Sequence, residues 1–137
     1  MESFDPYDEL VQRATEARER AYSPYSHYAV GAALLGKSGR IYMGCNVENA
    51  SYGLTVCAER TAILKAVSEG EREFHAIAVV TMNGGTPCGA CRQVLYEFLP
   101  PEAPVIVSDT AGHRIVYALD QLLAHGFGPA HLPGRES

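Results

Sequence analysis

The sequence contains no run of basic residues. Its 11 lysines and arginines are scattered among 137 residues and outnumbered by 16 acidic residues, which gives a net charge of −5 at pH 7. Proteins that bind DNA or RNA usually concentrate lysine and arginine on one surface, because neutralised phosphates supply much of their affinity. The charge balance therefore argues against a nucleic-acid partner and favours a small-molecule ligand.

Long apolar runs and a secretory leader are also missing. No stretch approaches the roughly 20 apolar residues that a membrane span needs, so no membrane association is expected. The acidic stretch Met1–Asp8 lacks the basic and then apolar pattern of a signal peptide. Cysteine is scarce, with four residues. We therefore expect a cytoplasmic protein whose thiols stay reduced, and no disulfide framework.

Neither an internal repeat nor a linker divides the chain, so we expect residues 1–137 to form one domain. Apolar residues recur at helical spacing from Asp5-Pro6, a typical helix start, to about Ala21. The further elements are predicted as strands at 29–35 and 41–45, a helix at 56–68, a strand at 77–81, a helix at 89–98, strands at 105–107 and 115–117, and a helix at 120–123. This alternation indicates an α/β fold whose sheet is covered on both faces.

Two short motifs, CAER at 57–60 and PCGAC at 87–91, carry the candidate chemistry. Cys57, Cys88 and Cys91 can supply three ligands to zinc and leave a fourth position for water, as catalytic zinc sites do. Both motifs lie in the first turn of a predicted helix, where the partial positive charge of the N-terminus favours thiolates. Glu59 lies two residues from a ligand, so its carboxylate can exchange protons with that water.

Charge balance in such a site requires a nearby cation. Three thiolates on Zn²⁺ give a formal charge of −1, which makes a bound water less acidic than neutral histidine ligands would. Arg60, one helical turn after Cys57, is the main candidate to donate to a thiolate, and Arg92 is a weaker one. Arg60 could instead be an ordinary surface residue of the helix.

Other interpretations of the cysteines stay open at this point. Cys45 could be the fourth ligand of a closed, structural zinc site, although that leaves Glu59 unexplained. Cys88 and Cys91 could be a thioredoxin-like redox pair, although that leaves Cys57 unexplained. The histidines show no ligand spacing; they are His27, His75, His113, His125 and His131.

The two motifs together match the signature of zinc-dependent deaminases in a three-cysteine form. The sequence closely resembles cytidine deaminases, specifically the short, three-cysteine type that forms homotetramers, over most of its length. The resemblance is densest in four blocks that follow the family's order: SPYSHYAVGAA at 23–33, GCNVENASYG at 44–53, CAERTA at 57–62 and PCGACRQ at 87–93.

The resemblance implies a three-layer α/β/α sandwich with a mixed five-stranded sheet. It implies one zinc ion per subunit, bound by Cys57, Cys88 and Cys91, and hydrolytic deamination of cytidine and 2′-deoxycytidine in pyrimidine salvage. In this chemistry, water activated on the zinc attacks C4 of the pyrimidine, and Glu59 acts as the proton shuttle.

Substrate contacts follow from the resemblance position by position. Asn46 and Glu48 would hold the ribose 3′-hydroxyl, since an amide and a carboxylate can grip one hydroxyl as donor and acceptor; capping of their own loop is the alternative. The backbone N–H of Ala58 would meet the pyrimidine O2. Tyr28 stands where the family usually has a phenylalanine against the base, and its added hydroxyl requires a protein partner or water.

Two further aromatic residues are implied to act between subunits of a homotetramer. Phe127 matches a tail phenylalanine that in the family reaches into a neighbour's site, and Tyr52 would likewise act across an interface. Both could instead be ordinary core or surface aromatic residues. The alternatives are a deaminase of another small aminopyrimidine such as blasticidin S, and a zinc-stabilised binding module without activity. Asn46 and Glu48 argue against a free base, which would need no ribose contact.

Overall fold

The computed structural model describes residues 6–124. Its elements are α1 (Pro6–Arg18), β1 (Gly31–Gly36), β2 (Ile41–Cys45), the 3-10 turn η1 (Tyr52–Leu54), α2 (Ala58–Ser68), β3 (Phe74–Val80), α3 (Gly89–Phe98), β4 (Pro104–Ser108), β5 (Arg114–Ala118) and α4 (Leu119–Leu122). None of these helices is long and apolar enough to cross a membrane. The order of helices and long strands is the predicted one.

The two largest boundary differences from the prediction, three residues each, have physical reasons. Helix α1 ends at Arg18, three residues before the predicted end at Ala21, because the backbone of Tyr22 is already hydrogen-bonded to Asn46 and Glu48. Strand β3 begins at Phe74, three residues before the predicted start at 77. Exposed His75 interrupts the apolar run there, which concealed the start of the strand.

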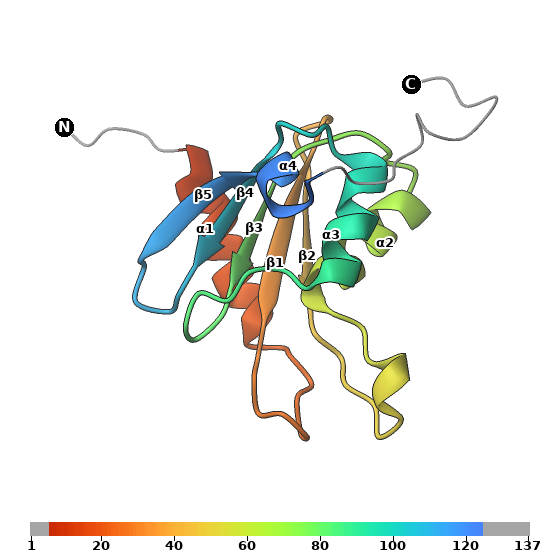
Figure 1. Ribbon diagram of the computed structural model, residues 1–137, viewed down its shortest axis with the longest axis vertical. Helices are drawn as coiled ribbons and strands as arrows, with labels where there is room; N and C mark the ends of the chain where they lie inside the picture. The colour runs from red at the N-terminus through yellow and green to blue at the C-terminus, as the bar shows by residue number, and fades with distance from the viewer. Residues whose placement is uncertain (1–5, 125–137) are drawn as a thin grey trace.

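The strands form one mixed sheet in the order β2-β1-β3-β4-β5 (Figure 1). Strands β3 and β4 are parallel and are joined through α3, whereas the other neighbours are antiparallel. A parallel pair needs such a crossover connection, because a tight turn can join only antiparallel strands.

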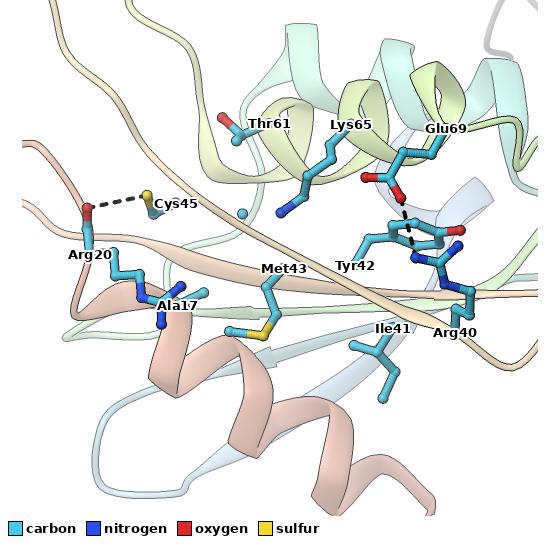
Figure 2. A pocket seen from close by; sticks show the side chains of 11 residues that line it. Ala17, Arg20, Arg40, Ile41, Tyr42, Met43, Cys45, Thr61, Lys65 and Glu69 are labelled. Atoms are coloured by element: carbon cyan, nitrogen blue, oxygen red, sulfur yellow. Dashed lines mark hydrogen bonds and ion pairs between the residues drawn. The ribbon is translucent and has the colours of Figure 1, made fainter.

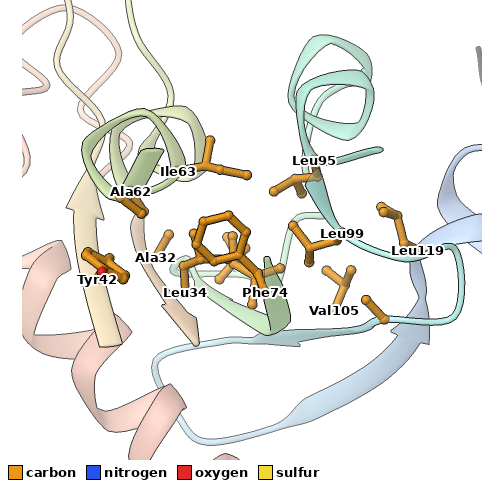
Figure 3. Close-up of a cluster of buried hydrophobic side chains, with 14 of the residues drawn as sticks. Ala32, Leu34, Tyr42, Ala62, Ile63, Phe74, Leu95, Leu99, Val105 and Leu119 are labelled. Carbon is orange, nitrogen blue, oxygen red and sulfur yellow. The ribbon is translucent and has the colours of Figure 1, made fainter. Parts of the chain in front are cut away.

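Helices cover both faces of this sheet, so the predicted α/β/α sandwich is confirmed. Helix α1 packs on one face through Leu10, Val11 and Ala14, whereas α2 and α3 cover the other face (Figure 1). Figure 3 shows the larger core between the sheet and α2 and α3. In β3, Ile77 and Val79 point into this core, and the alternate residues Ala76, Ala78 and Val80 point toward α1. Burial on both faces explains the strand's continuous apolar run.

Two glycines permit the helices to approach the sheet closely. A Cβ atom at Gly31 would lie 2.0 Å from the carbonyl oxygen of Ala14 in α1. A Cβ atom at Gly44 would lie 2.5 Å from the nitrogen of Ala62 and 2.6 Å from the oxygen of Ala58, both in α2. Gly44 therefore fixes how close the first turn of α2 comes to strand β2.

Gly44→Ala is expected to lower the free energy of unfolding by about 1–3 kcal/mol, because the new methyl group overpacks against the backbone of α2. Urea denaturation measures the change. Gly53→Ala is the matched control, since a Cβ atom there meets nothing within 4 Å. Equal stability of the two variants would show that α2 can move away from β2 at no cost.

Candidate active site

Three cysteine sulfurs meet where α2 and α3 begin. Cys57 and Cys88 are the N-cap residues of α2 and α3, one residue before the predicted first-turn positions, and Cys91 lies within the first turn of α3. The three Sγ atoms all lie within 4.8 Å of one another. Cys88 Sγ lies 3.8 Å from Cys57 Sγ and 3.3 Å from Cys91 Sγ.

This donor set fits a zinc ion. A tetrahedral site with zinc–sulfur bonds of about 2.3 Å places neighbouring sulfurs about 3.8 Å apart, close to the observed spacing. Hydrogen bonding from the Cys91 thiol lowers the pKa of Cys57 to about 5, and the same contact raises the pKa of Cys91 above its usual range. Without a cation, therefore, a charge on one sulfur opposes ionisation of its neighbour, whereas a divalent ion stabilises all three thiolates together.

Arg60 supplies positive charge beside this cluster. Its Nη2 atom lies 3.4 Å from Cys57 Sγ, one helical turn away. The hydrogen bond to Cys57 raises the pKa of Arg60 above its usual range, so the guanidinium stays charged. Arg92, the weaker candidate for this role, instead donates to the carbonyl oxygens of Pro87 and Leu122.

Glu59 is a buried acid in the first turn of α2. Glu59 is only 4% exposed and lines the same cavity as Cys57 and Cys88. Burial raises the pKa of Glu59 to about 7. A carboxylate with such a pKa can both accept and return a proton near neutral pH.

The cavity has a volume of about 440 Å³, within the range of small-molecule sites. It joins the metal-ligand motifs to the predicted substrate contacts. Its lining residues are Ser26, Tyr28, Val30, Asn46, Glu48, Thr55, Cys57, Ala58, Glu59, Val79, Thr81, Gly85, Thr86 and Cys88. Sequence reasoning missed several of these residues. The sequence predicts Thr81 only as the last residue of a strand, and the small residues at 85 and 86 have no signal but their position in the loop before Cys88.

Cys45 lies apart from this cavity. It lines a separate groove of about 340 Å³ between α1, β2 and α2 (Figure 2). Its thiol donates to the carbonyl oxygen of Arg20 over 3.4 Å. Among residues 6–124, only one set of three or more cysteine, histidine or acidic side chains lies close enough together to bind a metal ion. It consists of Cys57, Cys88 and Cys91. Cys45 therefore does not close a four-cysteine structural site.

Asn46 and Glu48 brace the walls of the cavity. The Asn46 side chain donates to the carbonyl oxygen of Tyr28 and accepts from the N–H of Val30, both over 2.9 Å. The Glu48 carboxylate accepts from the backbone N–H groups of Tyr25 and Ser26 over 3.0 and 3.1 Å, and from the Ser26 hydroxyl. The pKa of Glu48 is lowered, chiefly by the hydroxyl of Ser26.

The remaining predicted residues have different positions. Ala58 is fully buried, begins α2 and lines the cavity. The hydroxyl of Tyr28 donates to Asn83 Oδ1 over 2.6 Å, so it has the partner that it requires. Tyr52 is 75% exposed and stacks edge-on against Tyr25 beside the cavity, not in it. Phe127 lies outside the described residues.

Comparisons with known proteins agree with this site. Residues 5–107 match the family described as the cytidine and deoxycytidylate deaminase zinc-binding region. The chain is 51% identical over 120 residues to a cytidine deaminase from Halalkalibacterium halodurans, covering 86% of this chain and 91% of the relative. A cytidine deaminase from Sporosarcina psychrophila is 47% identical over 127 residues, with coverages of 91% and 93%.

Solved structures of cytidine deaminases are also similar to this chain. A crystal structure of cytidine deaminase from Burkholderia pseudomallei matches with a TM-score of 0.86 and 46% identity, covering 90% of this chain and all of that one. A crystal structure of cytidine deaminase from Mycobacterium tuberculosis matches with a TM-score of 0.78 and 41% identity, covering 91% of this chain and 99% of the other. The mixed five-stranded sheet is therefore shared with these proteins.

Cys88→Ser is expected to remove most of the bound zinc, because a serine hydroxyl is a poor substitute for a thiolate ligand. Cys45→Ser should retain about one zinc per chain, since Cys45 lies outside the cluster. Elemental analysis of both purified variants measures the difference. Loss of zinc from the Cys45 variant would mean that this residue contributes to the metal site.

Proposed function

Because this chain belongs to the cytidine and deoxycytidylate deaminase family, we propose that it hydrolyses cytidine and 2′-deoxycytidine to uridine and 2′-deoxyuridine, with release of ammonia. The observation that carries this proposal is a cluster of three sulfurs, two of whose cysteines line one cavity together with a buried carboxylate and a polar loop. The first two groups serve the reaction at C4, and the loop serves recognition of the ribose.

Cys57, Cys88 and Cys91 hold the zinc ion. When bound, zinc acts as a Lewis acid that makes a water molecule acidic enough to attack near neutral pH. Three thiolates reduce this acidifying effect because they donate negative charge. Arg60 offsets part of that charge through its contact with Cys57 Sγ.

Glu59 moves the protons of the reaction. Its carboxylate accepts a proton from the attacking water and delivers it to N3 of the pyrimidine ring. It then passes the second proton of the water to the departing amine, which leaves as ammonia while the C4 carbonyl forms. The burial that raises the pKa of Glu59 to about 7 suits it to both directions of transfer.

Asn46 and Glu48 recognise the ribose 3′-hydroxyl. They use the hydrogen-bonding groups that their contacts within the loop leave free. A carboxylate has about four lone-pair sites, and Glu48 uses three of them on Tyr25 and Ser26. The amide nitrogen of Asn46 has a second hydrogen besides the one given to Tyr28. A contact to the 3′-hydroxyl accepts ribonucleosides and deoxyribonucleosides alike.

Contacts to the base come from two further residues. The N–H of Ala58 lies at the start of α2, where no preceding turn supplies an acceptor, and it donates to the pyrimidine O2. Tyr28 presents its ring to the base, since its hydroxyl is already bonded to Asn83. The comparisons favour this nucleoside reaction over another aminopyrimidine or a binding module without activity.

Glu59→Gln is expected to lower kcat by about 10²- to 10⁴-fold, the typical contribution of a positioned proton-transfer group. The zinc content and the melting temperature should stay near those of the unmodified protein. Loss of cytidine absorbance measures turnover, with zinc quantified on the same sample. Glu16→Gln, an exposed substitution on α1, is the control.

Full zinc occupancy without turnover of cytidine or deoxycytidine by the unmodified protein would overturn the nucleoside reaction. Retention of most activity in Glu59→Gln would instead show that another group moves the protons.

We further propose that this cytoplasmic enzyme assembles as a homotetramer whose sites are completed by neighbouring subunits. Supporting this, the loops beside the cavity expose apolar side chains at Tyr22, Tyr25, Val47, Tyr52 and Leu54. Tyr25 and Tyr52 line a hollow that shares Ser26, Glu48 and Thr55 with the main cavity. A second copy of the chain would remove this apolar surface from water.

The double variant Tyr52→Ser, Leu54→Ser is expected to shift the molecular mass toward smaller species, because it removes two large exposed apolar groups from the contact. Light scattering coupled to gel filtration measures the mass. Ile115→Ser changes a similarly exposed residue on β5, at the opposite edge of the sheet from β2. A monomeric unmodified protein, or equal masses for both variants, would contradict this assembly.

A further inference from the structure

One wall of the cavity is a segment without regular secondary structure, from Thr81 to Cys88. Thr81, Gly85, Thr86 and Cys88 from this segment all line the cavity. Since Cys88 is also one of the three clustered cysteines, a shift of the segment would alter both the substrate wall and the metal site. Neither a helix nor a strand fixes its path, so other contacts must hold it.

Tyr28 holds the beginning of the segment. Its hydroxyl donates to Asn83 Oδ1 over 2.6 Å, and the Thr81 hydroxyl reaches the same oxygen over 3.4 Å. The Thr81 oxygen in turn accepts from the N–H of Gly85 over 2.9 Å. These contacts join Tyr28, which lies shortly before β1, to the backbone at Gly85.

The absence of a side chain at position 85 leaves room for this arrangement. A Cβ atom on Gly85 would lie 2.8 Å from the Tyr28 hydroxyl oxygen, but 4.0 Å from the ring carbon that carries it. An alanine there would displace the hydroxyl from Asn83. It would meet only ordinary contacts if the hydroxyl were missing.

Arg92 holds the end of the segment. Its Nε atom donates to the carbonyl oxygen of Pro87 over 2.7 Å, and its Nη2 atom donates to the Thr86 hydroxyl over 2.8 Å. Its Nη1 atom donates to the carbonyl oxygen of Leu122 at the end of α4, over 2.7 Å. The planar guanidinium thus fixes the two residues before Cys88 relative to α3 and α4.

We propose that Tyr28 and Arg92 are positioning residues that hold this segment at its two ends: the Tyr28 hydroxyl sets the substrate wall, and the Arg92 guanidinium keeps Cys88 in place to bind zinc. The part concerning Tyr28 rests on the proposed nucleoside reaction. The part concerning Arg92 does not, because metal retention is measured without substrate.

Tyr28→Phe is expected to raise KM for cytidine about 2- to 10-fold, the loss of one ordinary hydrogen bond, with a smaller change in kcat. Gly85→Ala alone should raise KM as well. In a chain that already carries Tyr28→Phe it should raise KM little further, because both changes break the same contact. Tyr117→Phe on β5 is the control. An unchanged KM in Tyr28→Phe, or independent effects of the two substitutions, would overturn this role of Tyr28.

Arg92→Lys is expected to raise the dissociation constant for zinc about 10- to 100-fold, as loss of support behind a metal ligand commonly does. Lysine keeps the charge but cannot donate in three fixed directions. Competition with a chromogenic chelator measures zinc affinity. Arg13→Lys, on the opposite face of the sheet, is the control. Zinc affinity equal to that of the control would overturn this role of Arg92.

Failure of the proposed function and failure of the positioning roles give different results. An unmodified protein that binds zinc but does not convert cytidine would overturn the proposed function, while the chelator experiment would still test Arg92. An active enzyme with unchanged KM in Tyr28→Phe would overturn only the positioning role of Tyr28.

Discussion

Mutual repulsion among three closely spaced sulfurs is the constraint on which the arrangement of this site depends. The Sγ atoms of Cys57, Cys88 and Cys91 lie within 4.8 Å of one another, so three thiolates are stable there only with positive charge nearby. Zinc supplies most of that charge, and two helix N-termini and Arg60 add to it. The close approach of α2 to β2 at Gly44 sets the position of the first turn of α2, which Cys57 caps and which contains Arg60.

Two arginines close to the ligands have different tasks in this arrangement. Arg60 contacts a sulfur directly and acts through its charge. Arg92 follows Cys91 in the sequence, yet its guanidinium contacts Pro87, Thr86 and Leu122, where geometry matters more than charge. Helical direction accounts for the difference: Arg60 lies one turn along α2 from its ligand, on the same face, whereas adjacent residues of a helix point in different directions.

Local signals in the sequence predicted most of the fold. Helix α3 and strand β2 have the predicted limits, because a proline-cysteine start, a double proline and a turn mark their ends. The metal ligands could be predicted because their spacing is specific to one chemistry. The start of β3, the contact between Tyr28 and Asn83, and the direction of Arg92 could not. Exposed His75 conceals the start of β3 in the apolar pattern. The other two depend on residues that only the tertiary fold brings together, which neither propensity nor spacing predicts.

The bracing contacts of the loop residues Asn46 and Glu48 are compatible with the recognition role proposed for them. Their side chains hold the backbone of residues 25 to 30, which taken alone favours the capping interpretation. The same bonds fix both polar groups in the cavity wall, so a ribose hydroxyl would meet them without the entropic cost of ordering free side chains. Glu48 keeps its charge because the bonds that restrain it also lower its pKa. Bracing would therefore prepare this pair for the proposed recognition of the ribose.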